Sequence, residues 1–321
     1  MRNIDKRLLE AVKNGDLDKV IELINLGADA NVIDDKYGMT PLHWASEKGH
    51  TEIVSYLFKV APNTAKVKDK DGMTPLHCAS WMGHTEVVSL LLEVVPDTAK
   101  EKDNDGKTPL HWASWKGYTE IVSYLLKVAP ETAQIKNNFG WTPLHSACLE
   151  GHTKIVSQLL KVAPKTAKEK NNDGQTPLHL ASWGGYTKIV PLLLKVAPET
   201  AKEKNDDGMT PLHYASSYGY IGIVSQLLKV APDTAKERDI YGQTPLLYAF
   251  WNGYTEVVSL LLEVAPDIVN VKNNDKKAPL YEARESNKKE TIQTLFTSIS
   301  IKLETEIQEI SKKYIKKKYI F

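Results

Sequence analysis

The sequence of 321 residues has little cysteine and no long apolar run. The two cysteines, Cys78 and Cys148, are too few for a disulfide framework, which favours a reducing compartment inside a cell. Apolar stretches such as residues 90–95, which Glu93 interrupts, are far too short to cross a bilayer. The first residues carry scattered charges and no apolar core, so we expect no secretory signal. We expect a cytoplasmic protein, with the nucleus and delivery into another cell left open.

Net charge is also nearly absent, because 41 Lys and Arg balance 40 Asp and Glu. A charge of +1 gives no field that would favour nucleic acid or an anionic membrane over other partners. The chain contains no Gly-x-Ser-x-Gly, no P-loop and no His-Glu-x-x-His. We therefore expect no enzymatic activity, no cofactor and no metal.

What the sequence does contain is a repeat with a period of 34 residues. The tetrapeptide TPLH is followed by TPLL at Thr244 and by the degenerate APLY at Ala278. TPLH itself begins at Thr40, Thr74, Thr108, Thr142, Thr176 and Thr210. All nine histidines fall at two positions of this repeat, so we interpret them as scaffold rather than as catalytic groups or ligands.

Each part of the repeat predicts a local structure. Thr108 is a good N-cap, and Pro109 suits the first helical position. Gly117 should end this inner helix, and Thr119 should cap a second, outer helix. The spacing of apolar residues at 121, 122, 125 and 126 predicts one apolar stripe on that helix, which Pro130 should stop. The unit is then a turn followed by two antiparallel helices.

These residues resemble the ankyrin repeat, whose hallmark is such a turn followed by TPLHxA and a second helix. The resemblance spans residues 5–297 and implies an all-α repeat solenoid of stacked helix-turn-helix units with β-turn or hairpin fingers. It also implies that the TPLH histidine hydrogen-bonds backbone and neighbouring turns. The period exceeds the usual one by a residue, and Ala-Pro replaces the usual Gly-Ala-Asp. We expect this to change the outer loop rather than the stacking.

The repeat divides the chain into four segments. Residues 1–34 form an N-terminal capping repeat, 35–272 seven repeats, 273–297 a degenerate C-terminal capping repeat, and 298–321 a basic amphipathic helix or tail. In the degenerate repeat Lys276 stands where the other turns have glycine. We expect the array to form one continuous domain. Pro191, which replaces a serine early in its outer helix, predicts a slight bend.

The seven tryptophans lie in the turns or inner helices, where ankyrin repeats line a concave face that binds partners. Trp44 and Trp112 share the position after the histidine, for which packing and partner contact are both open. A row at the exposed helix end favours contact, because tryptophan is enriched in interface hot spots. The candidate partner-binding residues are Trp81, Trp115, Trp183, Trp251, Trp112, Trp141, Phe139, Tyr37, Tyr218, Tyr241, Lys116 and Met82.

The sequence therefore predicts a non-enzymatic, monomeric scaffold that binds a protein or peptide in the concave groove. Mixed charge among the variable positions favours such a ligand over nucleic acid. An alternative is an adaptor or effector whose array selects a client while the basic C-terminal helix, with Lys312–Lys318, docks to other machinery or a membrane surface.

Overall fold

The computed structural model describes residues 1–278, 293–294, 296–297 and 300, and it divides into two compact units at residue 172. Within residues 1–278 the regular structure is helical and includes no strand. The predicted all-α class is thereby confirmed, with turns serving as the fingers. Most of the predicted capping repeat 273–297 and, apart from residue 300, the basic segment with Lys312–Lys318 lie outside the described residues.

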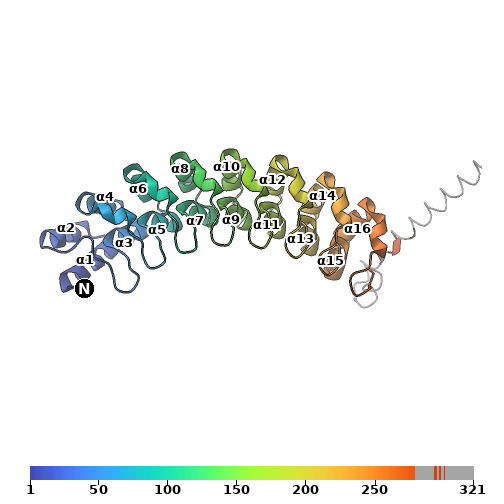
Figure 1. Ribbon diagram of the computed structural model, residues 1–321, viewed down its shortest axis with the longest axis horizontal. Coiled ribbons are helices and arrows are strands. Elements are labelled where there is room, and N and C mark those ends of the chain that lie inside the picture. Colours follow the sequence, from blue (N-terminus) through green and yellow to red (C-terminus); the bar gives the residue numbers. More distant parts are fainter. Residues whose placement is uncertain (279–292, 295, 298–299, 301–321) are drawn as a thin grey trace, which may run out of the picture. The chain divides into compact units, whose positions relative to one another are not determined.

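Unit 1, residues 1–172, consists of helix pairs in two rows (Figure 1). The inner helices α3, α5, α7 and α9 contact one another in order, and so do the outer helices α4, α6, α8 and α10. The pairs are α1 (Asn3–Asn14) with α2 (Leu17–Asn25), α3 (Pro41–Lys48) with α4 (Thr51–Val60), α5 (Pro75–Met82) with α6 (Thr85–Val94), α7 (Pro109–Lys116) with α8 (Thr119–Val128), and α9 (Pro143–Leu149) with α10 (Thr153–Val162). Short 3-10 helices follow the outer helices: η1 (Pro62–Lys66), η2 (Pro96–Lys100), η3 (Pro130–Gln134) and η4 (Pro164–Lys168).

Unit 2, from residue 173 onward, repeats this arrangement. Its pairs are α11 (Pro177–Trp183) with α12 (Val190–Val196), α13 (Pro211–Ser217) with α14 (Ile221–Val230), and α15 (Pro245–Asn252) with α16 (Thr255–Val264). The 3-10 helices are η5 (Pro198–Lys202), η6 (Pro232–Lys236) and η7 (Pro266–Asn270).

The inner helices begin and end as the sequence predicts. At the start of α7, Thr108 has extended backbone and forms a capping box with His111, and Pro109 takes the first helical position, where its missing N–H has no partner to lose. Gly117 ends the helix in the left-handed region, at φ 87°.

The outer helices pack through one apolar stripe. In α8 the four stripe residues, 121, 122, 125 and 126, are all buried, and each such side chain contributes about 1.5–3 kcal/mol. Thr119 is the first residue of this helix and Tyr118 is its N-cap, without a side-chain bond, so the prediction that Thr119 caps the helix was wrong. The helix ends at Val128, and Pro130 then begins η3.

The 3-10 helix accounts for the loop that differs from the usual ankyrin repeat. In η3 the Thr132 hydroxyl donates a hydrogen bond of 2.6 Å to the Ala129 carbonyl, and both Thr132 and Ala133 are buried. The extra residue therefore lies in an ordered turn behind the outer helix, while the inner helices keep their stacking within each unit.

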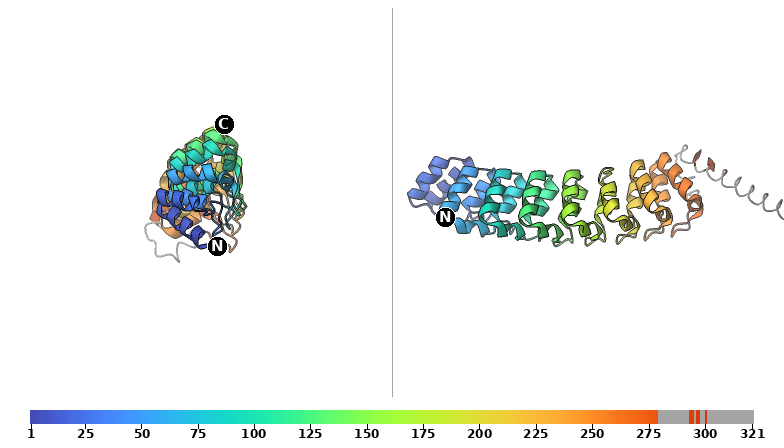
Figure 2. Two further views of the ribbon diagram at one scale, coloured as in Figure 1. Left: turned by 90° about the vertical axis from the view of Figure 1, so that its left-hand side faces the viewer. Right: turned by 90° about the horizontal axis from the view of Figure 1, so that it is seen from above.

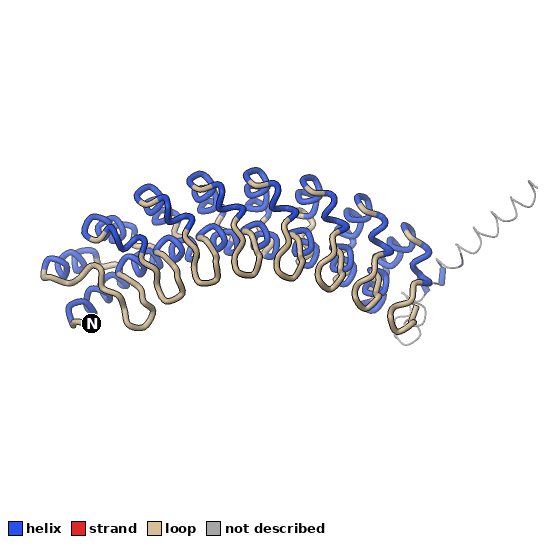
Figure 3. Tube along the Cα trace, viewed as in Figure 1, coloured by secondary structure: helices blue, strands red, loops and turns tan. Residues whose placement is uncertain are grey.

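The turns project to one side of the helices in each unit (Figure 3), and two further views show the same turns along one edge (Figure 2). Successive turns bond through the backbone: Asn104 N–H donates to the Asp71 carbonyl at 2.9 Å. A Cβ on Gly106, which has φ 76°, would lie 2.5 Å from the Asn138 amide oxygen. Glycine is therefore required there both by conformation and by the close approach of the next turn.

Candidate partner-binding site

The TPLH histidines connect each inner helix to the next turn. His111 Nδ1 accepts from Thr108, and its Nε2 donates to the Trp141 carbonyl, 3.0 Å away. His43 and His77 make the same contacts to the carbonyls of Met73 and Lys107. Burial lowers the pKa of His43 and His111 to about 4 and that of His77 to about 3. Neutral, fully bonded rings are structural, as the sequence predicts.

The tryptophans after the histidine are packed. Trp44 is 8% exposed and Trp112 is 7% exposed. Each indole N–H donates at 2.9 Å to a carboxylate of its own turn, Asp34 for Trp44 and Asp103 for Trp112. These bonds satisfy the one polar atom of the ring, so it can be buried between helix and turn. Trp112 is therefore a buried ring against which the more exposed Trp81 and Trp115 pack.

An aromatic cluster surrounds Trp112 in unit 1. Trp81 stacks on Trp112 with ring centroids 4.4 Å apart, and Trp115 is tilted against Trp112 at 5.6 Å. Trp115 is 37% exposed, and its indole donates to Glu150 at 2.8 Å. Lys116 Nζ lies 4.6 Å from the Trp115 ring centroid and 5.5 Å from that of Trp81. One face of α7 thus presents indole rings and a cation together.

The predicted turn residues of unit 1 differ in their exposure. Phe139 is 53% exposed at its turn, and Tyr37 is 45% exposed, with its ring edge-on to Trp44. Trp141 is half-buried, with its ring 6.2 Å from that of His145. Met82 is exposed at the end of α5.

Unit 2 carries a second aromatic group. Trp183 is 43% exposed, and its indole donates to the Tyr218 hydroxyl at 3.1 Å, with the two rings edge-to-face. Trp251 is half-buried against Tyr248 at 5.8 Å. Tyr241 is 61% exposed at its turn. Of the predicted residues in this unit, Trp183 and Tyr218 are thus in contact, and all four remain partly open to solvent.

Sequence reasoning did not select several partners of these rings. Lys107 Nζ lies 4.2 Å over Trp112, and Lys13 Nζ lies 3.8 Å over Trp44. Tyr248 occupies the position of Trp112 in its repeat and donates at 2.7 Å to the turn residue Asp239. The shared position after the histidine was the available signal for Tyr248, whereas no spacing pointed to Lys13.

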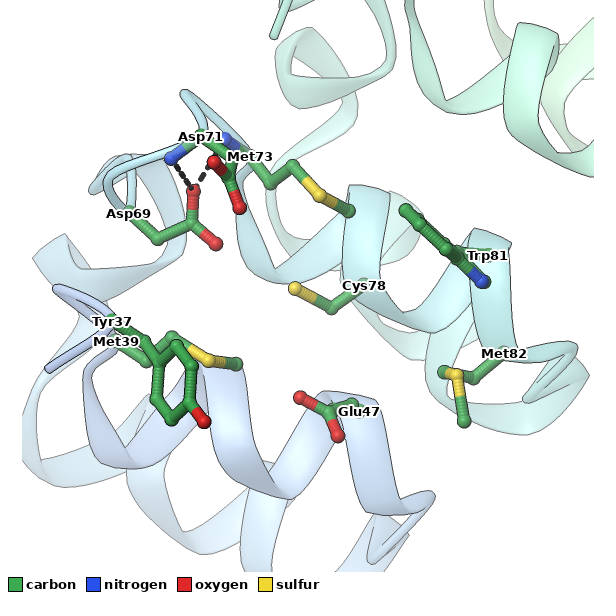
Figure 4. Close-up of a pocket in the computed structure, with 9 residues that line it drawn as sticks. All are labelled: Tyr37, Met39, Glu47, Asp69, Asp71, Met73, Cys78, Trp81 and Met82. Atoms are coloured by element: carbon green, nitrogen blue, oxygen red, sulfur yellow. Dashed lines mark hydrogen bonds between the residues drawn. The ribbon is translucent and has the colours of Figure 1, made fainter.

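A pocket of about 290 Å³ opens beside α5 in unit 1 (Figure 4). Asp69 Oδ1 accepts the backbone N–H groups of Asp71 and Met73, at 2.9 and 2.8 Å. Burial raises the pKa of the Asp69 carboxyl above its usual value. The lining residues are Tyr37, Met39, Glu47, Asp69, Asp71, Met73, Cys78, Trp81 and Met82.

The described residues also lack the features of two other kinds of site. No helix there is both long enough and apolar enough to span a membrane. No three His, Cys, Asp or Glu side chains within the same residues are grouped to hold a metal ion. Cys78 and Cys148 are free and buried, and burial raises the pKa of both thiols.

Family models for ankyrin repeats match most of the chain. The model described as ankyrin repeats (3 copies) matches residues 8–100, 129–202, 155–236, 196–271 and 231–306, and the one described as ankyrin repeats (many copies) matches 99–147. The chain therefore belongs to the ankyrin-repeat family, as its TPLHxA motifs predict. Repeats of this family generally mediate protein–protein interaction.

The chain is similar to several curated proteins over short segments. The chain is 45% identical over 53 residues to the 2-5A-dependent ribonuclease of Mus musculus, covering 16% of this chain and 7% of that protein. It is 43% identical over 54 residues to ankyrin repeat domain-containing protein 40 of Homo sapiens, covering 17% and 15%. It is 40% identical over 59 residues to myotrophin of Xenopus tropicalis, covering 18% and 49%. The chain thus spans less than half the length of each of these relatives.

Proposed function

We propose that the chain is a non-enzymatic scaffold that binds a protein or peptide partner on its inner-helix and turn face. The observation that carries this proposal is the set of half-exposed aromatic side chains at corresponding helix ends. Trp115 and Trp183 occupy the same position of their repeats, and 37% and 43% of their surfaces are exposed. Isolated exposed apolar residues are ordinary, but a repeated row of tryptophans is typical of an interaction surface.

The polar contacts of these rings also support binding. Trp115 and Trp183 donate to Glu150 and the Tyr218 hydroxyl, and both acceptors lie on the exposed surface. Such contacts hold the rings in one orientation without burying them. A partner then meets preorganised rings and loses less conformational entropy on binding.

The first experiment compares the proteins that wild-type chain and the double variant Trp115→Ala/Trp183→Ala recover in proximity labelling, followed by Kd measurements with the recovered partner. Truncating two hot-spot rings should weaken binding by about 2–4 kcal/mol, or roughly 30-fold to 1000-fold. The free energy of unfolding should fall by no more than about 0.5 kcal/mol per site, since both rings are partly exposed.

Tyr124→Ala is the matched control, because Tyr124 is a half-buried aromatic residue on the outer helix α8. It should leave the Kd unchanged. Equal loss of binding in this control, or a loss of stability in the double variant as large as its loss of affinity, would show that the tryptophans act as packing residues.

We further propose that the chain works as a monomer in a reducing compartment inside a cell, the cytoplasm in the first place. The two free, buried thiols support that compartment, because a secreted protein of this length more often stabilises itself with disulfides. Sedimentation of the purified chain across a range of concentrations tests the monomer, and microscopy of a tagged chain tests the compartment.

A further inference from the structure

The repeat containing α5 differs from both of its neighbours at the position after the histidine. Trp44 in α3 and Trp112 in α7 fill the space behind the turn and donate to its carboxylate. In α5 the corresponding residue is Cys78, which is 4% exposed and too short to reach across. Asp69 Oδ1 keeps its backbone bonds, but Asp69 Oδ2 receives no donor from the described residues. The pocket is the volume that the missing indole leaves open.

The cation that accompanies each neighbouring indole is missing from this repeat as well. Lys13 lies over Trp44 and Lys107 lies over Trp112, at 3.8 and 4.2 Å from the ring centroids. Met73 stands at the turn position that corresponds to Lys107. This repeat therefore keeps the turn carboxylate but supplies neither the ring nor the ammonium group that its neighbours provide.

The lining suits a long basic side chain. Three carboxylates, those of Glu47, Asp69 and Asp71, belong to the pocket, and the rings of Tyr37 and Trp81 form part of its wall (Figure 4). Three methionine side chains, Met39, Met73 and Met82, give flexible apolar surface that can pack along an aliphatic stem.

The basic groups near the pocket already have partners, among them the lining residues Tyr37 and Glu47. Lys70 Nζ donates to the carbonyls of Asp35 and Lys36, and Lys36 Nζ lies 4.6 Å from the Tyr37 ring centroid. Lys48 pairs with Glu47 at 3.1 Å, but this pair is exposed, and an incoming cation can displace it at little cost.

We propose that this pocket receives an arginine or lysine side chain of the partner, whose charged head donates to Asp69 Oδ2 while its stem packs against the methionines. The proposal rests on the proposed function and specifies the chemistry of the partner. The volume, near the lower end of small-molecule pockets at roughly 300 Å³, fits one side chain rather than a helix. The charge and the aromatic walls favour a cation over a neutral ring.

The test uses the full chain with 13C-labelled methionine methyl groups and the blocked peptide acetyl-Ala-Ala-Arg-Ala-Ala-amide. Saturable shifts are expected at Met39, Met73 and Met82, while Met1 and Met209, which do not line the pocket, should not move. The lysine peptide should bind at the same site. The peptide with neutral citrulline in place of arginine should bind at least tenfold more weakly.

Three variants locate the interaction. Cys78→Trp fills the pocket as Trp44 and Trp112 fill theirs, and it should abolish the shifts, whereas Cys78→Ala should preserve them. Asp69→Asn should weaken binding at least tenfold without unfolding the turn. Asn137 holds the same position in another turn and accepts both corresponding backbone N–H groups, and Asn205 accepts that of Met209.

Equal binding of arginine and citrulline peptides would overturn the proposal, as would unchanged binding in Cys78→Trp or in Asp69→Asn. None of these outcomes affects the experiment on Trp115 and Trp183, which are on α7 and α11 and do not line this pocket. Conversely, if Trp115→Ala/Trp183→Ala binds the partner as tightly as the wild type, the proposed function fails. The methionine shifts with the arginine peptide still test this pocket separately.

Discussion

Lys276 has a left-handed backbone conformation at a turn position where the preceding repeats have glycine. Its φ is 62°, and its N–H donates to the Asn273 carbonyl at 3.0 Å, so the turn is the same as the others. The corresponding glycines, 38, 72, 106, 140, 174, 208 and 242, have φ between 72° and 77°. A residue with a Cβ in this region costs roughly 1–2 kcal/mol.

We expect Lys276→Gly to raise the free energy of unfolding by about 0.5–1 kcal/mol, because the relief of strain exceeds the greater entropy of glycine in the unfolded chain. Urea-induced unfolding measures the change. The reciprocal variant Gly106→Lys should destabilise by more than this, since its Cβ would also meet Asn138. A neutral or destabilising result for Lys276→Gly would contradict the argument from strain.

Which individual side chains are buried is harder to predict from the sequence than the repeat itself. Trp44 and Trp112 could be packing or contact residues on their pattern alone, since their burial depends on carboxylates nine or ten positions earlier that accept the indole N–H. Cys78 is a small core residue, and the pocket beside it results from the absence of a ring. Only the three-dimensional comparison with neighbouring repeats reveals that space.

At the scale of elements, the helix pairs were predictable because the same 34-residue pattern recurs in register. The residues that begin and end each inner helix act through local backbone geometry and hydrogen bonds. Thr108, Pro109 and Gly117 fix the ends of α7 without reference to the rest of the chain. The 3-10 helices were not predicted. Their apolar contacts, such as those that bury Thr132 and Ala133, form only once the outer helix is packed.

Pro191 has a larger effect than the slight bend that its position predicts. Most outer helices have ten residues, but α12 begins at Val190 and has seven. Proline lacks the N–H that would bond the carbonyl of Thr187, four residues earlier, and the side chain of Gln226 approaches this carbonyl at 3.5 Å. The first turn of the helix is consequently lost.

We expect Pro191→Ser to restore this turn, because serine stands at the same position in other outer helices, such as Ser123 in α8. Val190 N–H already donates to the Tyr186 carbonyl at 3.2 Å, so the one bond gained is that of the new N–H at residue 191 to the Thr187 carbonyl. This N–H should be protected from hydrogen exchange, and stability should rise by about 0.5–1.5 kcal/mol. Pro198→Ser is the control, since Pro198 begins η5 where no N–H is needed, and its new N–H should exchange rapidly. Rapid exchange of the new N–H in Pro191→Ser would show that another contact shortens the helix.

At the scale of the whole molecule, the same buried histidine recurs in both units. Burial lowers the pKa of His213 in unit 2 to about 4, as it does for His43 and His111 in unit 1. The unfolded chain binds protons at these histidines near pH 6.5, whereas the folded chain does not until about pH 4. Their stabilising contribution is complete above pH 6.5 and is lost as the pH falls toward 4.

Acidification from pH 7 to pH 5 should therefore lower stability by about 2 kcal/mol for each such histidine. Asp69 and Asp103, whose carboxyl pKa values are raised by burial, act in the opposite direction, so a histidine variant is needed to assign the change. Urea-induced unfolding at the two pH values, fitted with a model in which neighbouring repeats interact, measures the difference.

His111→Leu identifies the group responsible, because Leu247 occupies this position, fully buried, in the seventh repeat. At pH 7 the variant should lose about 1–3 kcal/mol, since the Trp141 carbonyl and the Thr108 N–H lose their partner. Its further loss between pH 7 and pH 5 should be smaller than that of the wild type by about 2 kcal/mol. A variant that is destabilised at pH 7 but keeps the full pH dependence would show that His111 is a brace whose protonation does not control acid unfolding. The two effects separate because one depends on hydrogen bonds present at both pH values, and the other on a proton that between pH 7 and pH 5 is taken up mainly by the unfolded chain.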